Sequence, residues 1–268
     1  MKFALVASSQ DPAALNIKQA LIDNYKFEEL KETYDSNEVY ELKNIKIYTT
    51  RKKIVYTEDI DKEVEADFFI FISKHSGKYD RKTLSVHMPG NWGKAELGGK
   101  DKSLMICSPS YFKEALMELN NLNNIGYEVT GETDHHGPYI EKPCFFIEIG
   151  PNQEQWNDKD AAHVLAKALM NLFDKNHKEY KIAIAIGGNH YMSAFNKIQL
   201  DTDIALTHVC PKHYLQDFDE KMLYQAINKS TAKATLAVLD WKGLGQEKQR
   251  IISLLKDYNL EIIRSDKI

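Results

Sequence analysis

Short apolar runs alternate with longer amphipathic stretches along the chain, and this alternation restricts the fold more than any other sequence feature. Six runs have the length and composition of buried strands, at 2–7, 67–73, 144–149, 181–186, 204–209 and 236–239. Apolar residues recur at helical spacing in 109–120, 157–173, 219–228 and 246–257, and Asp11-Pro12 has the pattern of a helix start. The alternation predicts an α/β protein with a mixed, largely parallel central sheet flanked by helices.

Weaker patterns fill the intervals between these elements. Five further runs are candidate strands, at 45–50, 54–56, 84–87, 104–108 and 127–132. The 268 residues contain no repeat, no low-complexity tract and no Pro/Gly/Ser-rich linker. We therefore expect a single α/β domain over 1–268, with the polar region 26–62 as a candidate small insertion.

Composition narrows the setting in which the protein works. No apolar run reaches the roughly 20 residues that a bilayer span needs, so we expect no membrane association. Three dispersed cysteines (Cys107, Cys144 and Cys210) form no paired motif and fit a reducing cytoplasm. The net charge of −4 is unlike that of a general nucleic-acid binder, so any contact with RNA requires a local basic patch.

The positions of the histidines carry the strongest functional signal. Six of the nine lie at or just after the carboxyl ends of predicted strands, where ligands bind in open α/β sheets. If those strands are parallel, the six imidazoles gather at one rim of the sheet. They are candidate metal ligands: His75, His87, His135, His136, His190 and His208.

Two carboxylates accompany these histidines. Asp134 precedes His135 and His136 and could fix the tautomer of a neighbouring imidazole, as metal sites and general bases require. Glu148 lies inside an apolar strand, where a carboxylate must be paired or shift its pKa upward. It can ligate a metal, act as a general base or pair with a buried cation. The expected catalytic residues are His135, His136, His190 and Glu148, although no HExxH or CxxC motif indicates zinc directly.

Two loops near these histidines have a functional and a structural interpretation. The turn Gly187-Gly188-Asn189 before His190 can hold an oxyanion with its backbone N–H groups, or it can simply be a tight strand-to-helix turn. The segment 74–82 can contact the phosphate backbone of a nucleic acid or be an ordinary solvated loop. Its four cations are Lys74, Lys78, Arg81 and Lys82.

These segments together resemble the archaeal and plant type of D-aminoacyl-tRNA deacylase. The resemblance rests on Ser-Lys-His-Ser at 73–76, Leu-Ser-Val-His at 84–87, Gly-Asn-Trp-Gly at 90–93, Asp-His-His-Gly-Pro at 134–138, Glu-Ile-Gly at 148–150 with Trp156, Gly-Gly-Asn-His-Tyr at 187–191 and Asp-Trp-Lys-Gly-Leu at 240–244. The blocks follow the order found in the family. The sequence departs from the family pattern at three places: Lys74 for arginine, Asn189 for glycine, and Met192-Ser193 for an Ala-Pro pair.

The resemblance implies a cytoplasmic, monomeric hydrolase that frees D-amino acid and tRNA from the mischarged ester, without an obligate protein partner. It also implies zinc dependence and a fold like that of the phosphorylase/hydrolase-like group, which includes peptidyl-tRNA hydrolase. Glu148 and the six histidines named above are the candidate zinc ligands. The four cations of segment 74–82 are the candidates for tRNA binding.

Three other functions remain open on the sequence alone. A zinc-dependent aminopeptidase-like enzyme or a nucleoside phosphorylase-like enzyme could share this scaffold. A non-catalytic tRNA-binding protein would use its histidines to line an RNA groove, and it would be expected to show more exposed aromatic residues among basic ones.

Overall fold

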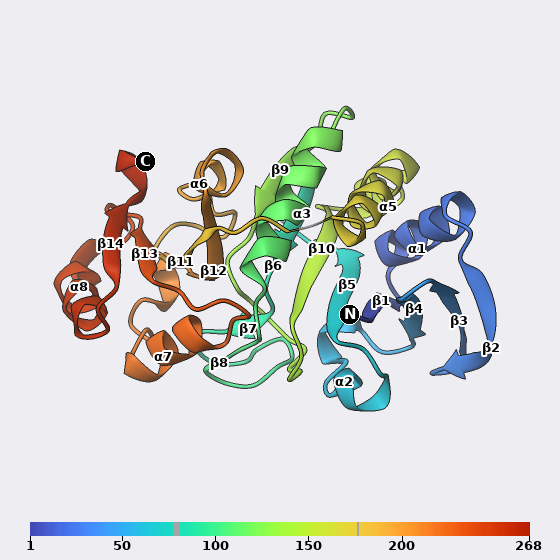
Figure 1. Ribbon diagram of the computed structural model, residues 1–268, viewed down its shortest axis with the longest axis horizontal. Coiled ribbons are helices and arrows are strands. Elements are labelled where there is room, and N and C mark those ends of the chain that lie inside the picture. The colour runs from blue at the N-terminus through green and yellow to red at the C-terminus, as the bar shows by residue number, and fades with distance from the viewer. Residues whose placement is uncertain (78–80, 176) are drawn as a thin grey trace.

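The strands form two main sheets and a short separate ladder in the computed structural model, which describes residues 1–77, 81–175 and 177–268 (Figure 1). The larger sheet has eight strands, in the order β2 (Glu28–Tyr34), β3 (Asn37–Leu42), β4 (Ile45–Thr50), β1 (Phe3–Ser8), β5 (Phe68–Lys74), β10 (Cys144–Gly150), β6 (Thr83–His87) and β9 (Glu128–Gly131). The smaller has the order β12 (Ile204–Cys210), β11 (Lys181–Ile186), β13 (Leu236–Leu239) and β14 (Glu261–Arg264). The ladder joins β7 (Gly90–Asn91) to β8 (Ser103–Leu104).

Strand directions confirm the predicted mixed, largely parallel architecture. In the larger sheet β4, β1, β5 and β10 run parallel to one another, and the smaller sheet is parallel throughout. The antiparallel pairs are β2 with β3, β3 with β4, and β6 with β10, so β3 and β6 run opposite to the other strands named. Strand β9 is parallel to β6 and therefore also runs opposite to β10.

Three helices cover one face of the larger sheet: α1 (Pro12–Asn24), α3 (Pro109–Leu122) and α5 (Lys159–Phe173) (Figure 1). The first turns of α1 and α5 are each capped by the aspartate that precedes the helix. Asp11 accepts a hydrogen bond from the Ala14 amide at 3.0 Å, and Asp158 accepts bonds from the first amides of α5. The opposite face packs against α2 (Ile60–Glu63) and the 3₁₀ turn η1 (Ile54–Tyr56) through a second apolar cluster.

The smaller sheet has its own helices and shares a core with the larger one. Helices α7 (Glu220–Asn228) and α8 (Lys248–Asp257) pack on it, and α6 (Asn196–Asp201) lies between β11 and β12 in the chain. Leu5 and Ile70 of the larger sheet belong to the same apolar cluster as Leu206 and Val238 of the smaller one. The remaining short elements are α4 (Gln153–Trp156), η2 (Lys212–Tyr214), η3 (Gly245–Glu247) and η4 (Ser265–Lys267).

Some element predictions were wrong in detail. Residues 54–56 form a 3₁₀ turn instead of a strand, and in 104–108 only Leu104 belongs to a strand, followed by isolated bridges at Ile106 and Cys107. The sequence pattern also did not reveal β2, β3 and β14, whose residues are partly exposed and mostly polar. Region 26–62 contributes β2, β3 and β4 to the edge of the larger sheet. Among the described helices, none has the length and apolar character to cross a membrane.

Candidate active site

Strand periodicity places a set of polar side chains on one face of the larger sheet. Successive residues of a strand point to opposite faces, so Ile147 and Ile149 enter the helix-covered core while Glu148 faces the other side. The register pairs Glu148 with Ser73 of β5 and Ser85 of β6. Ser73 Oγ donates to Glu148 Oε1 at 2.5 Å, and Glu148 is buried. The lone glutamate of the apolar strand is therefore held in a polar row that crosses three strands.

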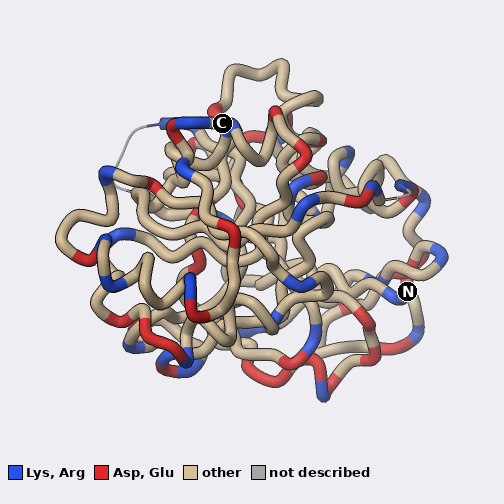
Figure 2. Tube along the Cα trace, turned by 60° about the vertical axis from the view of Figure 1, so that its left-hand side comes forward, with Lys and Arg blue, Asp and Glu red and all other residues tan. Residues whose placement is uncertain are grey.

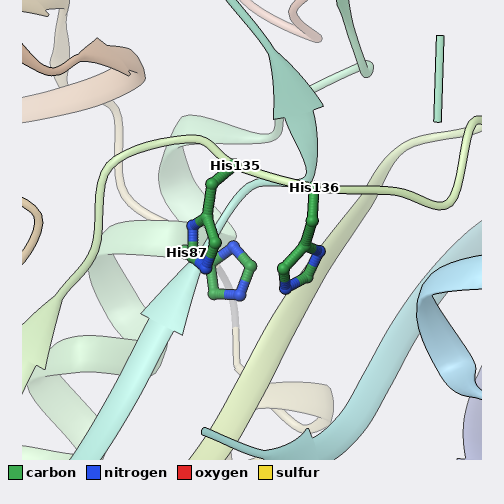
Figure 3. Close-up of side chains that lie close together, drawn as sticks. All are labelled: His87, His135 and His136. Atoms are coloured by element: carbon green, nitrogen blue, oxygen red, sulfur yellow. The ribbon is translucent and has the colours of Figure 1, made fainter. Parts of the chain in front are cut away.

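Three histidines meet beside this row (Figure 3). His135 and His136 descend from one loop, and the ring of His87, at the end of β6, stacks against His135 with centroids 4.1 Å apart. One nitrogen from each ring can be chosen so that all three lie within 4.8 Å of one another. In each ring Nδ1 lies within 3.1 Å of a main-chain carbonyl oxygen. The partner of His87 is Met88, that of His135 is Thr133 and that of His136 is Gly137. A carbonyl only accepts, so Nδ1 of each ring carries a proton, and Nε2 is the nitrogen left to face a metal ion.

A buried glutamate connects this trio to two further histidines. Glu132 has no exposed surface, and its Oε1 lies 3.2 Å from His75 Nδ1. Its Oε2 lies 2.9 Å from His190 Nε2 and 3.6 Å from His135 Nε2. Sequence reasoning missed Glu132, although it is the last residue of the predicted strand 127–132 and stands two residues before Asp134. That position was the available signal.

The electrostatics of the cluster follow from burial and from the two carboxylates. Burial acts to lower the pKa of His75, but its contacts with Glu132 and Glu148 outweigh this and raise the pKa to about 11. Burial would raise the pKa of Glu148, yet the contacts with His75 and His87 lower it to about 2. His75 is therefore an imidazolium and Glu148 a carboxylate at neutral pH.

The other two loop histidines behave in the opposite way. Burial, reinforced by the nearby charge of His87, lowers the pKa of His136 to about 4 and that of His135 well below its usual value. Both rings are neutral at pH 7, which is the form that binds a metal ion.

Two cavities of similar size meet at His75, Ser76 and His190. The first has a volume of about 470 Å³ and is lined by Ser8, Gln10, Asp11, Lys53, Ile54, Val55, Ser73, Lys74, His75, Ser76, Leu97, His135, His136, Glu148 and His190. The second has a volume of about 480 Å³ and is lined by His75, Ser76, Gly77, Arg81, Asn189, His190 and Tyr191. Each is large enough for one part of a small substrate.

The histidines converge by a different route from the one predicted. The sequence pattern suggested parallel strands that deliver them to one rim, but β6 and β9 run opposite to β10. His87 nevertheless reaches Glu148, with Nε2 3.7 Å from Oε2, because Glu148 pairs with Ser85, two residues earlier in a five-residue strand. The short length of β6 brings its carboxyl end to the site.

The structure separates His208 from the other five histidines. It is fully buried on β12 of the smaller sheet, and its Nδ1 lies 2.5 Å from Asp134 Oδ2. Its Nε2 lies 2.9 Å from the Lys229 carbonyl oxygen. With both ring nitrogens engaged, His208 has no free donor atom for a metal. Asp134 does orient an imidazole, as its position suggested, but that imidazole is His208.

The turn before His190 is a tight glycine turn in which one of the three predicted amide donors is already occupied. Gly187 and Gly188 adopt φ values of 98° and 83°, which favour glycine, and Gly187 donates its N–H to the Cys210 carbonyl at 2.9 Å. Asn189 accepts hydrogen bonds from the amide and hydroxyl of Ser193 at 3.2 and 3.0 Å. The N–H of Gly187 is therefore occupied, and the turn serves to present His190 to both cavities.

The predicted cations of segment 74–82 border the site unevenly. Lys74 lines the first cavity, and its ammonium lies 4.7 Å from the centre of the Trp156 ring. Arg81 lines the second cavity, and Lys78 lies outside the described residues. Both remaining cations form ion pairs. Arg81 Nη1 lies 3.3 Å from Glu128 Oε2, and Lys82 Nζ lies 3.8 Å from Glu154 Oε1.

Comparison with known proteins identifies relatives over nearly the full chain. A family model described as D-aminoacyl-tRNA deacylase matches residues 62–263. Proteins of that name from Pyrococcus furiosus and Picrophilus torridus are 37% and 30% identical, each over 97% of this chain and 98% of their own length. A solved structure titled as a conserved protein of unknown function has a TM-score of 0.92 and 30% identity, and the match covers 100% of this chain and 96% of that one.

Proposed function

This chain belongs to the D-aminoacyl-tRNA deacylase family, and from that premise we propose that its histidine cluster is a zinc site at which the ester is hydrolysed. The chain is a hydrolase that acts on the ester bond between a D-amino acid and tRNA. The observation that carries the assignment of the site is the meeting of three imidazoles, those of His135 and His136 neutral, with two buried carboxylates.

The residues at this site fit a zinc ion. His87 Nε2 is buried and has no hydrogen-bond partner among the described residues, and the buried carboxylate oxygens of Glu132 lie beside imidazole nitrogens without a hydrogen bond of good geometry. Such orphaned atoms are costly unless something binds them. Imidazole nitrogen and carboxylate oxygen are donors that zinc prefers, and each Nδ1 of the trio is fixed by a carbonyl. We assign zinc binding to His87, His135 and His136, with Glu132 and Glu148 as adjacent donors, and we assign other roles to His75 and His190.

A bound zinc ion supplies Lewis acidity, which polarises an ester carbonyl and makes water a better nucleophile. The protein supplies the proton acceptor. Glu132 can only accept, so its contact with His190 Nε2 fixes the proton on that nitrogen and leaves Nδ1 free to accept one. His190 borders both cavities, so it is our candidate general base for the attacking water.

Positive charge beside the reacting centre comes from His75. Its imidazolium is held between Glu132 and Glu148, and its Nε2 lies 3.1 Å from the Tyr191 hydroxyl. Tyr191 borders the second cavity. We propose that this pair stabilises the negative charge that develops when the ester carbonyl is attacked.

The tRNA must be held by local charge. Lysine and arginine alternate with aspartate and glutamate along the chain, and the net charge is −4 (Figure 2). Lys74 and Arg81, which line the cavities, and Lys82, the residue after Arg81, are therefore our candidates for phosphate contacts. We also propose a monomer that acts in the cytoplasm, where aminoacyl-tRNA is used.

Release of amino acid from D-Tyr-tRNA and L-Tyr-tRNA, with and without a chelator, tests this proposal. We expect D-selective release that the chelator blocks and added zinc restores, with zinc found by elemental analysis of the purified protein. D-selective release that is indifferent to the chelator would refute the zinc assignment. Hydrolysis of a D-amino-acid amide would favour a peptidase, a requirement for phosphate would favour a phosphorylase, and an intact ester would favour an RNA-binding protein.

A further inference from the structure

The first cavity has one apolar side, formed by Ile54, Val55 and Leu97, which we call the apolar wall. These three aliphatic side chains border the same space as His135 and His136. The rest of the lining is polar or charged.

Part of the apolar wall is open to solvent. Ile54 is buried, but Leu97 is 47% exposed, and the neighbouring Tyr56 is 45% exposed. A β-carbon added to Gly98 would lie 3.3 Å from the Tyr56 ring, so this ring lies against the backbone next to Leu97. Exposed apolar surface that gathers at the mouth of a cavity is typical of a ligand-binding site.

The apolar wall is held rigidly against the loop that carries the histidines. A β-carbon on Gly98 would lie 1.9 Å from the Val55 carbonyl oxygen, and one on Gly137 would lie 2.3 Å from the Gly99 amide nitrogen. Three backbone segments therefore touch directly, with no side chains between them. Gly137 also donates its N–H to the Leu97 carbonyl at 2.9 Å.

Glu58 strengthens this arrangement. Its two carboxylate oxygens accept the Gly99 amide at 2.6 Å and the Tyr139 amide at 2.5 Å. The Asn91 side chain donates to the Gly98 carbonyl at 3.0 Å. Leu97 is thus fixed relative to His136 before any substrate binds, and a preformed apolar surface costs little conformational entropy when it is covered.

The second cavity differs in character. None of its described lining residues is aliphatic, and it offers Arg81, Asn189 and Tyr191 instead. The proposed function puts the ester near His75 and His190, where the cavities meet, so the amino acid would occupy one cavity and the terminal nucleoside the other. An apolar side chain matches the first, and a polar nucleoside matches the second.

We propose that the apolar wall receives the side chain of the D-amino acid and makes the enzyme favour large apolar or aromatic D-aminoacyl groups. The inference rests on the proposed function and adds the substrate class to it. Covering Leu97 and Val55 removes apolar surface from water, which a small or charged side chain cannot do.

The test compares kcat/KM for D-Tyr, D-Ala and D-Glu carried by the same tRNA. For the wild-type protein we expect D-Tyr to exceed D-Glu by about tenfold or more. Leu97→Ala should lower kcat/KM for D-Tyr by about tenfold and for D-Ala by at most about threefold, because only a large substrate side chain reaches Leu97. Leu97→Lys should raise D-Glu relative to D-Tyr by about tenfold, because it places a cation on the wall.

Leu15→Ala is the matched control, because Leu15 is 39% exposed on α1 and does not line either cavity. It should leave all three values unchanged. If the wild type cleaves D-Tyr-tRNA but both Leu97 variants change all three esters equally, or not at all, the inference is wrong while the proposed function stands. If the wild type cleaves none of the three esters, the proposed function fails and this inference fails with it.

Discussion

The carboxylate of Asp134 joins the ring of His208 across the two sheets, with Oδ2 2.5 Å from Nδ1 and both side chains buried. The other oxygen of Asp134 accepts the Val209 amide at 2.7 Å. The loop that carries His135 and His136 is thereby fastened to β12. His208, which the sequence pattern predicted as a metal ligand, instead anchors the loop that carries His135 and His136.

Removal of the Asp134 carboxylate should therefore destabilise the fold and disturb the site together. Asp134→Ala leaves the His208 ring and the Val209 amide without a buried partner, and we expect the free energy of unfolding to fall by about 3 kcal/mol. Urea unfolding measures this. Glu65→Ala breaks the exposed ion pair with Lys2 and should cause no measurable change. Equal midpoints for the wild type and Asp134→Ala would contradict the role of Asp134.

His135 and His190 should have separable effects. His135→Ala removes a proposed zinc ligand, so zinc content and turnover should fall together. His190→Ala removes the proposed general base, so kcat should fall by about 10²–10⁴-fold while zinc is largely retained. Elemental analysis and single-turnover kinetics give the two readouts.

The control for both variants is His163→Ala, because His163 is exposed on α5, away from the cavities. It should behave as the wild type. Near-wild-type activity in both His135→Ala and His190→Ala would contradict the assignment of the site. Loss of zinc in His190→Ala as complete as in His135→Ala would move His190 from the role of base to that of ligand.

Much of this fold and site could be predicted from sequence because both depend on local patterns. Runs such as 67–73 are strand-like whatever surrounds them, and most of the histidines that follow such runs do meet. Glu132 was not predicted because its role depends on three imidazoles that approach it from the segments following β5, β9 and β11. The prediction that His208 is a metal ligand was wrong because its strand belongs to a second sheet, and no local sequence pattern reveals that the strands divide into two sheets.

The direction of β6 is a similar case. Its five residues are apolar in alternation and read as a strand, but a strand's direction depends on pairing with distant segments. The strand-like appearance of 54–56 also misled, since the backbone there turns to bring Val55 against Gly98. Contacts with distant segments therefore determine both the direction of β6 and the turn at 54–56.

Lys113 gives the fold a pH dependence that can be measured. It is buried on α3, its ammonium donates to the Gln199 carbonyl, and burial lowers its pKa to about 8 from 10.5. Below pH 8 the folded protein bears the cost of a buried charge, and above pH 10.5 both states are neutral. Stability relative to Lys113→Met should therefore rise by about 3 kcal/mol as pH increases from 8 to 10.5.

Unfolding free energies of both proteins across that pH range provide the measurement. Because other groups titrate there too, only the difference between the two proteins is informative. Lys159→Met, at an exposed position, is the control and should give a difference that does not vary with pH. A flat difference for Lys113→Met as well would show that Lys113 titrates normally in the folded state.

Gly98 and Gly126 form a matched pair that tests how tightly the apolar wall is built. Both have positive φ, 70° and 76°, so alanine is strained at each and should cost about 1 kcal/mol from the backbone alone. A β-carbon at Gly126 would meet nothing within 4 Å, whereas at Gly98 it would lie 1.9 Å from the Val55 carbonyl oxygen. We expect Gly98→Ala to cost about 2–3 kcal/mol more than Gly126→Ala in urea unfolding, because the backbone around Val55 must move.

Gly98→Ala should also lower kcat/KM for D-Tyr-tRNA, while Gly126→Ala should not. Equal costs for the two variants would mean that the segments bearing Val55 and Leu97 yield easily, and the wall would then not be preformed.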